Sequence, residues 1–295
     1  MTGITKNQIR WLEDKARWLR QQTVKYSFGV PHHLGGSLSC IEILIGLYYG
    51  LKSDESGNDI GQTKFVLSKG HACIPLYIVL ADLQMIEAAE LEKMMSMGGR
   101  LLGHPCRSTT NGIDVSTGSL GQGLSFAIGM GLGARASRQD ARICALLGDS
   151  ELQSGQVWEA LLFLSQHKLA NVRAVIDFNK FQADGSLHEI VSIDPLANKL
   201  RSLGLQVSEC DGHDISQIIR FFRCDVVDRP AVLIAHTTKG KGVSFMEHDN
   251  AWHSGTLSPE LYRKAMEELS VPSVDQRVFA IDAVESPVAE NQGSR

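Results

Sequence analysis

The sequence predicts an α/β fold, in which a mostly parallel sheet carries helices on both faces. Its 295 residues, 43% of them hydrophobic, suffice for one large domain with an ordinary buried core. In the second half, short apolar runs alternate with stretches of helical periodicity, which is the pattern of repeated strand–helix–strand units. Twelve of the 28 glycines fall between Gly98 and Gly155, which indicates a segment whose backbone must approach something closely.

The first third of the chain predicts helices around one short strand. Its first helix is amphipathic, with apolar side chains at helical spacing and a charged opposite face. A turn with a proline, two histidines and two glycines follows, and Ser37 or Ser39 could cap the buried helix after it. The expected elements are helices over 4–28 and 40–50, a polar loop over 53–63, a strand over 64–68, and helices over 71–85 and 87–97.

The rest of the chain predicts four strands separated by helices. Asp194 and Pro195 suit the N-cap and the first residue of one of these helices. We see no internal repeat and no linker, so residues 1–270 form one domain and 271–295 a loosely docked or disordered tail. The strands are expected over 142–147, 172–178, 205–210 and 231–236, and the helices from 123 on and over 156–168, 194–204 and 214–223.

Charge and hydropathy exclude several classes of protein. Twenty-nine basic and 33 acidic residues give a net charge of −4 without a basic block, so nucleic acid is not an expected partner. No apolar run reaches the roughly 18 residues of a membrane span, and the polar start lacks the core of a secretory signal. The six cysteines include no CxxC pair. We expect reduced thiols and a cytoplasmic protein.

Two neighbouring strands of the predicted sheet end in oxygen-bearing side chains. Gly148-Asp149-Ser150 follows one strand, and Asn179 follows the next, 30 residues after Asp149. That spacing is about one strand–helix–strand repeat, so the two side chains should emerge side by side. A carboxylate, an amide and a free carbonyl are suitable ligands for Mg²⁺. The alternative is that both residues only end their strands as turn residues.

Five sequence motifs occur together in a fixed order between residues 10 and 265. They are HHLGGSLS (32–39), FVLSKGHA (65–72), LGHP (102–105), STGSLGQGLSFAIGMG (116–131), and GDS (148–150) with Asn179. Together they resemble the thiamine-diphosphate-binding half of transketolase. The resemblance implies thiamine diphosphate and Mg²⁺ as cofactors, with Mg²⁺ held by Asp149, Asn179 and the Phe181 carbonyl. It assigns the remaining cofactor contacts to His71, Gly118, Leu120, Gly148, Asp149, Ser150, Asn179 and His253.

The resemblance also selects histidines. His33, His104 and His253 occupy the places of family histidines that exchange protons or hydrogen bonds with the substrate near neutral pH. His71 and His253 are expected at the diphosphate. The family histidine placed at His253 could instead correspond to His248, because GVSFMEHDNAWHSG allows both alignments.

The chain also departs from the family pattern. Full-length transketolases are more than twice as long, and the glutamate that protonates the aminopyrimidine lies in their second domain. The resemblance therefore implies the N-terminal subunit of a split transketolase, in an α2β2 heterotetramer with a C-terminal, pyrimidine-binding subunit. An apolar interface is expected around 110–135 and 150–165. Ser150 and Ser154 replace the family's glycine and glutamate, which puts proton communication between sites and the usual substrate in question.

The implied activity is that of a transferase that needs its partner subunit. It would move a two-carbon ketol unit from a ketose, or a ketose phosphate, to an aldehyde acceptor. One alternative is decarboxylation of a 2-oxo acid followed by acyl or acyloin transfer in specialised metabolism. The other is a degenerate homologue that binds a partner without catalysis.

Overall fold

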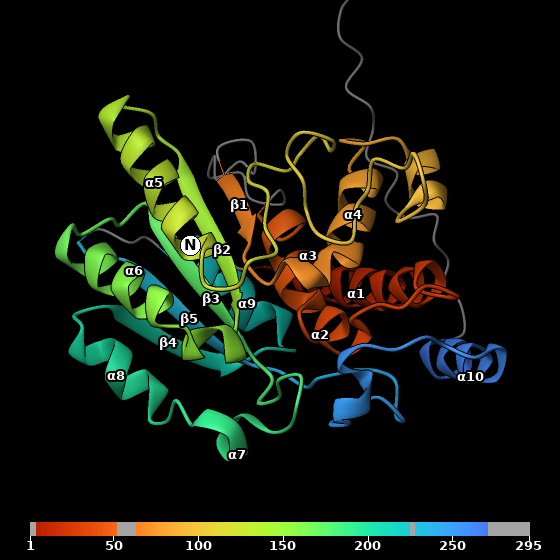
Figure 1. The fold of residues 1–295 in the computed structure, drawn as a ribbon. Coiled ribbons are helices and arrows are strands. Elements are labelled where there is room, and N and C mark those ends of the chain that lie inside the picture. The colour runs from red at the N-terminus through yellow and green to blue at the C-terminus, as the bar shows by residue number, and fades with distance from the viewer. Residues whose placement is uncertain (1–3, 52–62, 225–227, 271–295) are drawn as a thin grey trace, which may run out of the picture.

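The computed structural model describes residues 4–51, 63–224 and 228–270, and in them one five-stranded sheet has the order β1-β2-β3-β5-β4 (Figure 1). Every pairing in it is parallel. The register sets Gly148 beside Asp177, so the loops that follow β2 and β3 begin side by side. The strands are β1 (Thr63–Leu67), β2 (Arg142–Gly148), β3 (Val172–Phe178), β4 (Gln206–Asp211) and β5 (Ala231–His236).

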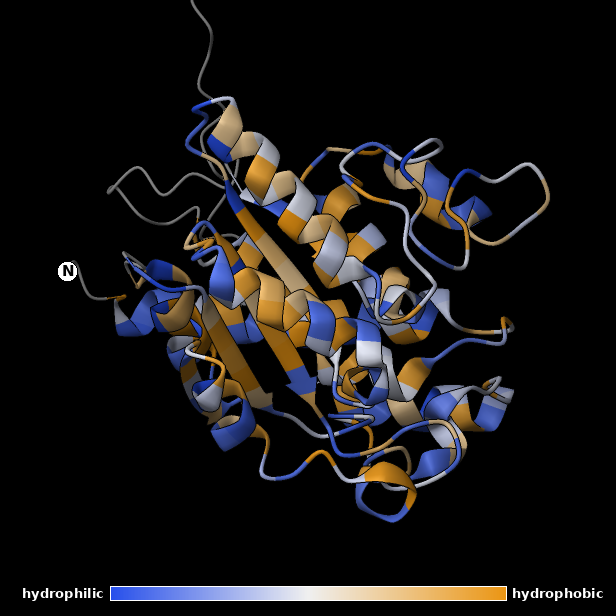
Figure 2. Ribbon diagram, turned by 60° about the vertical axis from the view of Figure 1, so that its left-hand side comes forward, coloured by the Kyte–Doolittle hydropathy of each residue, from blue (hydrophilic) through white to orange (hydrophobic). Residues whose placement is uncertain are grey.

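Helices cover both faces of this sheet, as predicted. Alternate residues of β2 show why: Leu146 packs into the core on one face and Ala145 into the core on the other. Figure 2 shows the strands as a largely hydrophobic layer between the helices. One face carries α1 (Lys6–Tyr26), α3 (Ile41–Tyr48), α4 (Cys73–Asp82) and α9 (Ile215–Arg223), and the other carries α5 (Gly123–Ala136), α6 (Gly155–Gln166) and α8 (Leu196–Ser202).

A smaller third core joins the two ends of the described chain. Leu34 of α2 (Leu34–Ser39) packs there with Val243 and with Ala265 of α10 (Pro259–Leu269). Short helical turns complete the chain, namely η2 (Gly70–Ala72), η3 (Ala88–Lys93), η4 (Ser150–Gln153), α7 (Leu187–Val191) and η5 (Asn250–His253). No helix within the described ranges has both the length and the apolar content needed to cross a bilayer.

The structure corrects two of the expected helix starts. Ser37 and Ser39 cap no helix, because they lie inside α2, and Cys40 is the residue between α2 and α3. Asp194 is not an N-cap either: Pro195 has an extended backbone (ψ 102°) and itself precedes α8. Proline fixes φ but leaves ψ free, so its presence did not determine where the helix begins.

Other expectations fall on or near residues that are not described. The polar loop expected over 53–63 lies outside the described residues except for its last position, which begins β1. The tail expected over 271–295 lies outside them entirely. The helix α10 was not anticipated, although Ser258 and Pro259 are typical of a helix start and Ser258 accepts a hydrogen bond from the Leu261 N–H.

Candidate functional site

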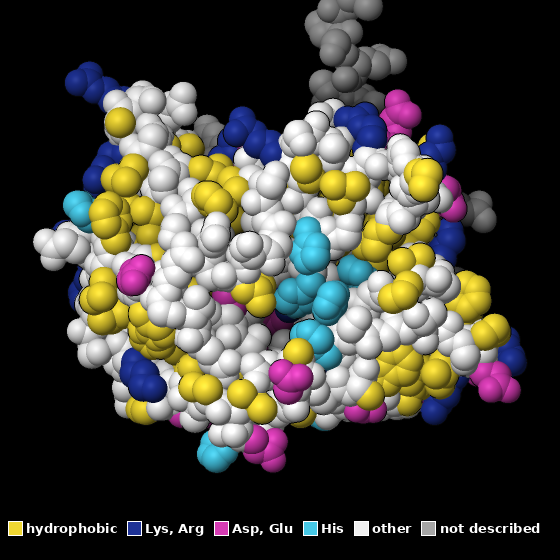
Figure 3. Space-filling model, viewed as in Figure 1, with side chains coloured by type: hydrophobic (Ala, Val, Ile, Leu, Met, Phe, Trp, Pro, Cys, Tyr) yellow, Lys and Arg dark blue, Asp and Glu magenta, His cyan; other side chains and the backbone are white. Residues whose placement is uncertain are grey.

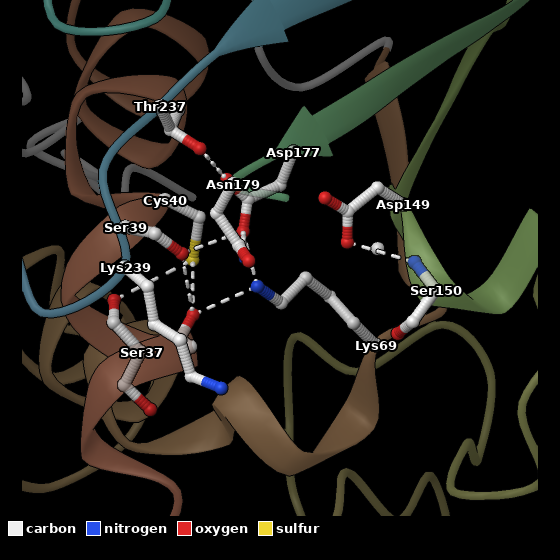
Figure 4. Close-up of polar contacts among 12 residues, drawn as sticks. Ser37, Ser39, Cys40, Lys69, Asp149, Ser150, Asp177, Asn179, Thr237 and Lys239 are labelled. Atoms are coloured by element: carbon white, nitrogen blue, oxygen red, sulfur yellow. Dashed lines mark hydrogen bonds and ion pairs between the residues drawn. The ribbon is translucent and has the colours of Figure 1, made fainter. Parts of the chain in front are cut away.

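The candidate site lies at the carboxyl ends of the strands, where the loops that follow parallel strands lie close together. The loop after β1 contributes Lys69 and His71, the loop after β2 contributes Asp149, and the loop after β3 contributes Asn179. The segment after β5 adds Lys239. Figure 4 shows the side chains of Lys69 and Asn179 meeting at Asp177, with those of Asp149 and Lys239 to either side, all from segments far apart in the sequence.

Asp177 is the buried centre of this convergence. Its carboxylate accepts hydrogen bonds from Ser39 Oγ (2.6 Å), Lys69 Nζ, Thr237 Oγ1 and Asn179 Nδ2 (3.3 Å) (Figure 4). Burial opposes its ionisation, but the Lys69 ammonium holds the pKa of Asp177 below its usual value. Lys69 also donates to the Gly36 carbonyl (2.8 Å). This ion pair therefore fixes the floor of the site, and its partners satisfy both buried charges.

The predicted Mg²⁺ ligands lie beside this ion pair. Asp149 and Asn179 are both buried, and Asp149 Oδ1 accepts a hydrogen bond from the Ser150 N–H (2.7 Å). Asn179 Oδ1 accepts one from the Phe181 N–H (3.1 Å). Burial and the Asp177 carboxylate raise the pKa of Asp149 to about 7. A bound divalent cation would stabilise the ionised form of the Asp149 carboxylate. One carboxylate, one amide and one carbonyl are hard oxygen donors of the kind that Mg²⁺ binds.

These residues supply only part of a magnesium shell. Within the described residues, no group of three or more His, Cys, Asp or Glu side chains is arranged to hold a metal. The predicted set contains a single acid, Asp149, so phosphate oxygens or water would have to complete six ligands. The set therefore fits a metal that arrives together with a diphosphate.

Three of the predicted histidines form a cluster. The ring centroid of His33 lies 5.1 Å from that of His71 and 5.2 Å from that of His253, and the last two rings are 6.0 Å apart. Figure 3 shows histidine side chains gathered in a hollow on this face. His248 instead contacts the Phe181 ring, with centroids 6.4 Å apart. Of the two alternatives, His253 is the one that joins the cluster.

The cluster is held in the neutral state. Burial, followed by the Lys239 charge, lowers the pKa of His253 to about 4. Burial also lowers the pKa of His33 and, more strongly, that of His71. At neutral pH these imidazoles can therefore each donate one hydrogen bond and accept another.

The glycine-rich loop before α5 lies against the His104 ring. Gly118 has φ +145°, and a Cβ atom there would lie 3.3 Å from the His104 ring. The adjacent Thr117 Oγ1 is buried and has no hydrogen-bond partner among the described residues. Leu120, two residues after Gly118, is 44% exposed. An unpaired hydroxyl, bare backbone and an exposed apolar side chain beside histidines suit a ligand with a ring and polar groups, as thiamine diphosphate has.

Lys239 was not predicted as a site residue, although it precedes His253 by only 14 residues. Its side chain is 1% exposed, and its Nζ donates to the Gln182 carbonyl (3.1 Å) and to Asn250 Oδ1 (2.9 Å). The same Nζ lies 3.4 Å from His253 Nδ1. Burial, with Lys69 nearby, lowers the pKa of Lys239 to about 8. A Cβ on Gly35 would lie 2.9 Å from Lys239 Cγ, which explains the need for glycine in HHLGG.

Lys69, Asp177 and Glu151 were missed as well. Each sits in or next to a motif that was recognised, so a charged residue flanked by glycine or apolar residues at a strand end was the available signal. Single-sequence patterns place such residues on loops, but only the folded structure shows that they are buried and paired. Gly148 is the last residue of β2, and Ser150 begins η4 directly after Asp149.

Comparisons with known proteins identify the family of this chain. Residues 14–282 match the family model described as transketolase, thiamine diphosphate binding domain. One of the subunits of apulose-4-phosphate transketolase from Phocaeicola vulgatus is 35% identical over 268 residues, which cover 89% of this chain and 95% of that protein. The 6-deoxy-6-sulfo-D-fructose transketolase subunit SqwG of a Clostridium species is 36% identical over 264 residues, covering 88% of this chain and 96% of that protein.

Longer transketolases match over less than half their length. Human transketolase is 31% identical over 269 residues, which are 90% of this chain and 43% of the human protein. The crystal structure of transketolase from Campylobacter jejuni superposes with a TM-score of 0.77 at 26% identity, and covers 90% of this chain and 43% of that one.

Proposed function

Because the chain belongs to the transketolase family through its thiamine diphosphate binding domain, we propose that it is the cofactor-binding subunit of a split transketolase. It transfers a two-carbon ketol unit from a ketose or ketose phosphate to an aldehyde, and it does so only with a partner subunit. The observation that carries this proposal is the match, over nearly their full length, to relatives named as subunits of a transketolase. The chain spans 95% of a relative named as one subunit of a transketolase and 43% of human transketolase.

Thiamine diphosphate supplies, when bound, the nucleophilic carbon that this chemistry requires. The backbone at Gly118 and Leu120 would hold its ring region, next to the unpaired Thr117 hydroxyl. Gly148, Ser150 and His71 would lie against the diphosphate. The Mg²⁺ ion would bind Asp149, Asn179 and the Phe181 carbonyl.

The histidines handle the protons of the substrate. His33, His104 and His253 are the expected partners of a sugar, which carries several hydroxyl groups that need hydrogen bonds. Neutral imidazoles can accept a proton at one nitrogen while they donate from the other. Their lowered pKa values keep His33 and His253 in this state at neutral pH.

The partner would carry the pyrimidine-binding domain in an α2β2 assembly in the cytoplasm. Phe126 of α5 and Leu162 and Phe163 of α6 are 42%, 56% and 40% exposed. Figure 3 shows hydrophobic side chains on the surface over these two helices. They fall within the two segments expected to form the interface, and apolar side chains exposed on adjacent helices favour a protein partner.

The two alternative functions receive less support. Chemistry on 2-oxo acids does not need the number of hydrogen-bonding histidines that this hollow contains. A non-catalytic scaffold has no need for Asp149 and Asn179 to remain buried at adjacent strand ends.

Reconstitution with the partner subunit tests the proposal. With thiamine diphosphate and Mg²⁺, the pair should transfer a ketol unit from a ketose and should not consume pyruvate. This chain alone should be inactive toward both substrates. Asp149→Ala should lower the rate of the pair by at least about 100-fold, because it removes a direct metal ligand.

Asp140→Ala is the matched control, since Asp140 is an exposed carboxylate just before β2, at the opposite edge of the sheet. Its rate should equal that of the parent. Full ketol transfer by the isolated chain, or an Asp149→Ala pair as active as the parent pair, would refute the proposal.

A further inference from the structure

Glu151 is a buried acid at the foot of the candidate site, and it holds neither metal, diphosphate nor substrate in the proposed function. It lies in η4, two residues after Asp149, and is 2% exposed. A carboxylate removed from water is costly unless donors surround it. The donors that bind Glu151 therefore indicate what its burial achieves.

Three donors reach this carboxylate, one from each of three loops. Glu151 Oε1 accepts hydrogen bonds from the Gly121 N–H (2.7 Å) and from Ser68 Oγ, and Oε2 accepts one from the Gly148 N–H (3.1 Å). Ser68 follows β1, Gly121 precedes α5, and Gly148 ends β2. These three segments contain His71, Leu120 and Asp149, which are expected contacts of the diphosphate, the cofactor rings and Mg²⁺.

The loop at Gly121 is held from a second side as well. Gly121 has φ +87°, and a Cβ atom there would lie 2.7 Å from Ser154 Oγ. Because Ser154 immediately precedes α6, this loop is confined between Glu151 and the start of that helix. Little freedom remains for the backbone at Leu120, which precedes Gly121.

We propose that Glu151 is a positioning residue that sets the spacing of the three cofactor loops. Through Gly121 it fixes the backbone that faces the cofactor rings, and through Gly148 it fixes the start of the metal loop. Through Ser68 it fixes the loop that carries His71. This inference rests on the proposed function, and it adds that one carboxylate couples the ring-binding and metal-binding halves of the site.

Glu151→Gln keeps the size of the side chain but removes its charge and one of its two acceptor oxygens. An amide of the same shape has only one oxygen, so its NH₂ group must face either the Gly148 N–H or the donors from Ser68 and Gly121. At least one of the three contacts becomes donor against donor. Glu267→Gln makes the same chemical change on the exposed surface of α10 and serves as the control.

Hydrogen–deuterium exchange of the full chain without cofactor is the first measurement. Glu151→Gln should accelerate amide exchange in all three loops, in peptides covering 66–70, 118–122 and 146–150, while Glu267→Gln matches the parent. Exchange that changes only around Glu151 itself, or in none of the loops, would overturn the proposal. This result does not depend on activity, so it stands apart from a failure of the proposed function.

Cofactor titration of the complex with the partner subunit is the second measurement. The concentrations of thiamine diphosphate and of Mg²⁺ for half saturation should both rise by about tenfold or more, while kcat at saturation stays close to that of the parent. Unchanged half-saturation values would mean that Glu151 serves folding alone and would overturn the proposal. A parent complex that binds no thiamine diphosphate would instead refute the proposed function.

Ser68→Ala gives a milder second variant in case Glu151→Gln does not fold. It removes one donor and leaves the carboxylate bound to Gly121 and Gly148. Amide exchange should then increase in the 66–70 segment and not at 118–122. In the double variant, the increase in exchange should be smaller than the sum of the increases in the two single variants. Additive effects would contradict a shared network.

Discussion

His32, next to the site cluster, links the stability of the chain to pH. It is 3% exposed, and its backbone pairs with Gly255 in both directions (3.1 Å each). Burial, with His33 and His104 nearby, lowers the pKa of His32 to about 3. In the unfolded chain a histidine takes up a proton near pH 6.5. Acid therefore favours the unfolded state, because His32 stays neutral in the folded one.

The free energy of unfolding should accordingly fall as the pH drops below about 6.5, with a contribution from His32 of up to about 1.4 kcal/mol per pH unit. Urea denaturation at pH 7, 6 and 5 measures this slope. His32→Gln should flatten it, and His188→Gln, at an exposed position of α7, should not. An unchanged slope in His32→Gln would contradict the lowered pKa.

The residues that the sequence located share one property. Asp149 and Asn179 could be placed because strand ends follow from apolar runs, and parallel strands put adjacent ends together. Lys69, Asp177 and Glu151 could not be placed in this way. Their roles depend on burial and on partners in other segments, which period and spacing along one chain do not reveal.

The helix α9 ends in a way that only the packed structure explains. Arg173 in β3 is 6% exposed, and its Nη1 donates to the carbonyls of Phe221 (2.5 Å) and Phe222 (2.7 Å). Its Nη2 donates to the Cys224 carbonyl. The last carbonyls of a helix have no partner within the helix, so the strand supplies one.

Arg173→Met should therefore lower the free energy of unfolding by about 3 kcal/mol, because buried carbonyls lose charged donors. Arg201→Met is the control: Arg201 pairs with Glu209 on the surface (3.1 Å), and its loss should cost less than about 1 kcal/mol. Chemical denaturation of both variants compares the two values. Equal losses would show that the α9 carbonyls do not need this donor.

The strands were predictable to within one residue, and the helices less so. β2, β3 and β5 are buried on both faces and therefore stand out as continuous apolar runs. The short helix α2 was read as a turn, because its two glycines are poor helix formers. A Cβ on Gly35 would lie 2.8 Å from the Trp252 carbonyl oxygen and 2.9 Å from Lys239 Cγ, and one on Gly36 would lie 3.2 Å from His71 Nε2, so both positions leave little room for a side chain.

For the chain as a whole, the exposed side chains of α5 and α6 predict how it associates. Leu162 is 56% exposed, so Leu162→Asp should change the free energy of unfolding by no more than about 0.5 kcal/mol. The same substitution should weaken association with the partner subunit by about 30-fold or more if Leu162 lies near the centre of the interface. Size-exclusion chromatography with light scattering, on the mixed subunits, measures this effect.

Met97→Asp provides the comparison, since Met97 is fully exposed beyond η3. It places the same charge at a site away from α5 and α6 and should leave the complex intact. Equal weakening by both substitutions would point to a general effect of charge rather than to this face.

The convergence on Asp177 also bears on how the chain comes to be folded. Its partners are remote in sequence: Ser39 precedes it by 138 residues, Lys69 by 108, and Thr237 follows by 60. None of these contacts can form until α2, β1, β3 and β5 are already in place. The floor of the site therefore draws on both ends of the chain, and it is complete only when all four segments occupy their folded positions.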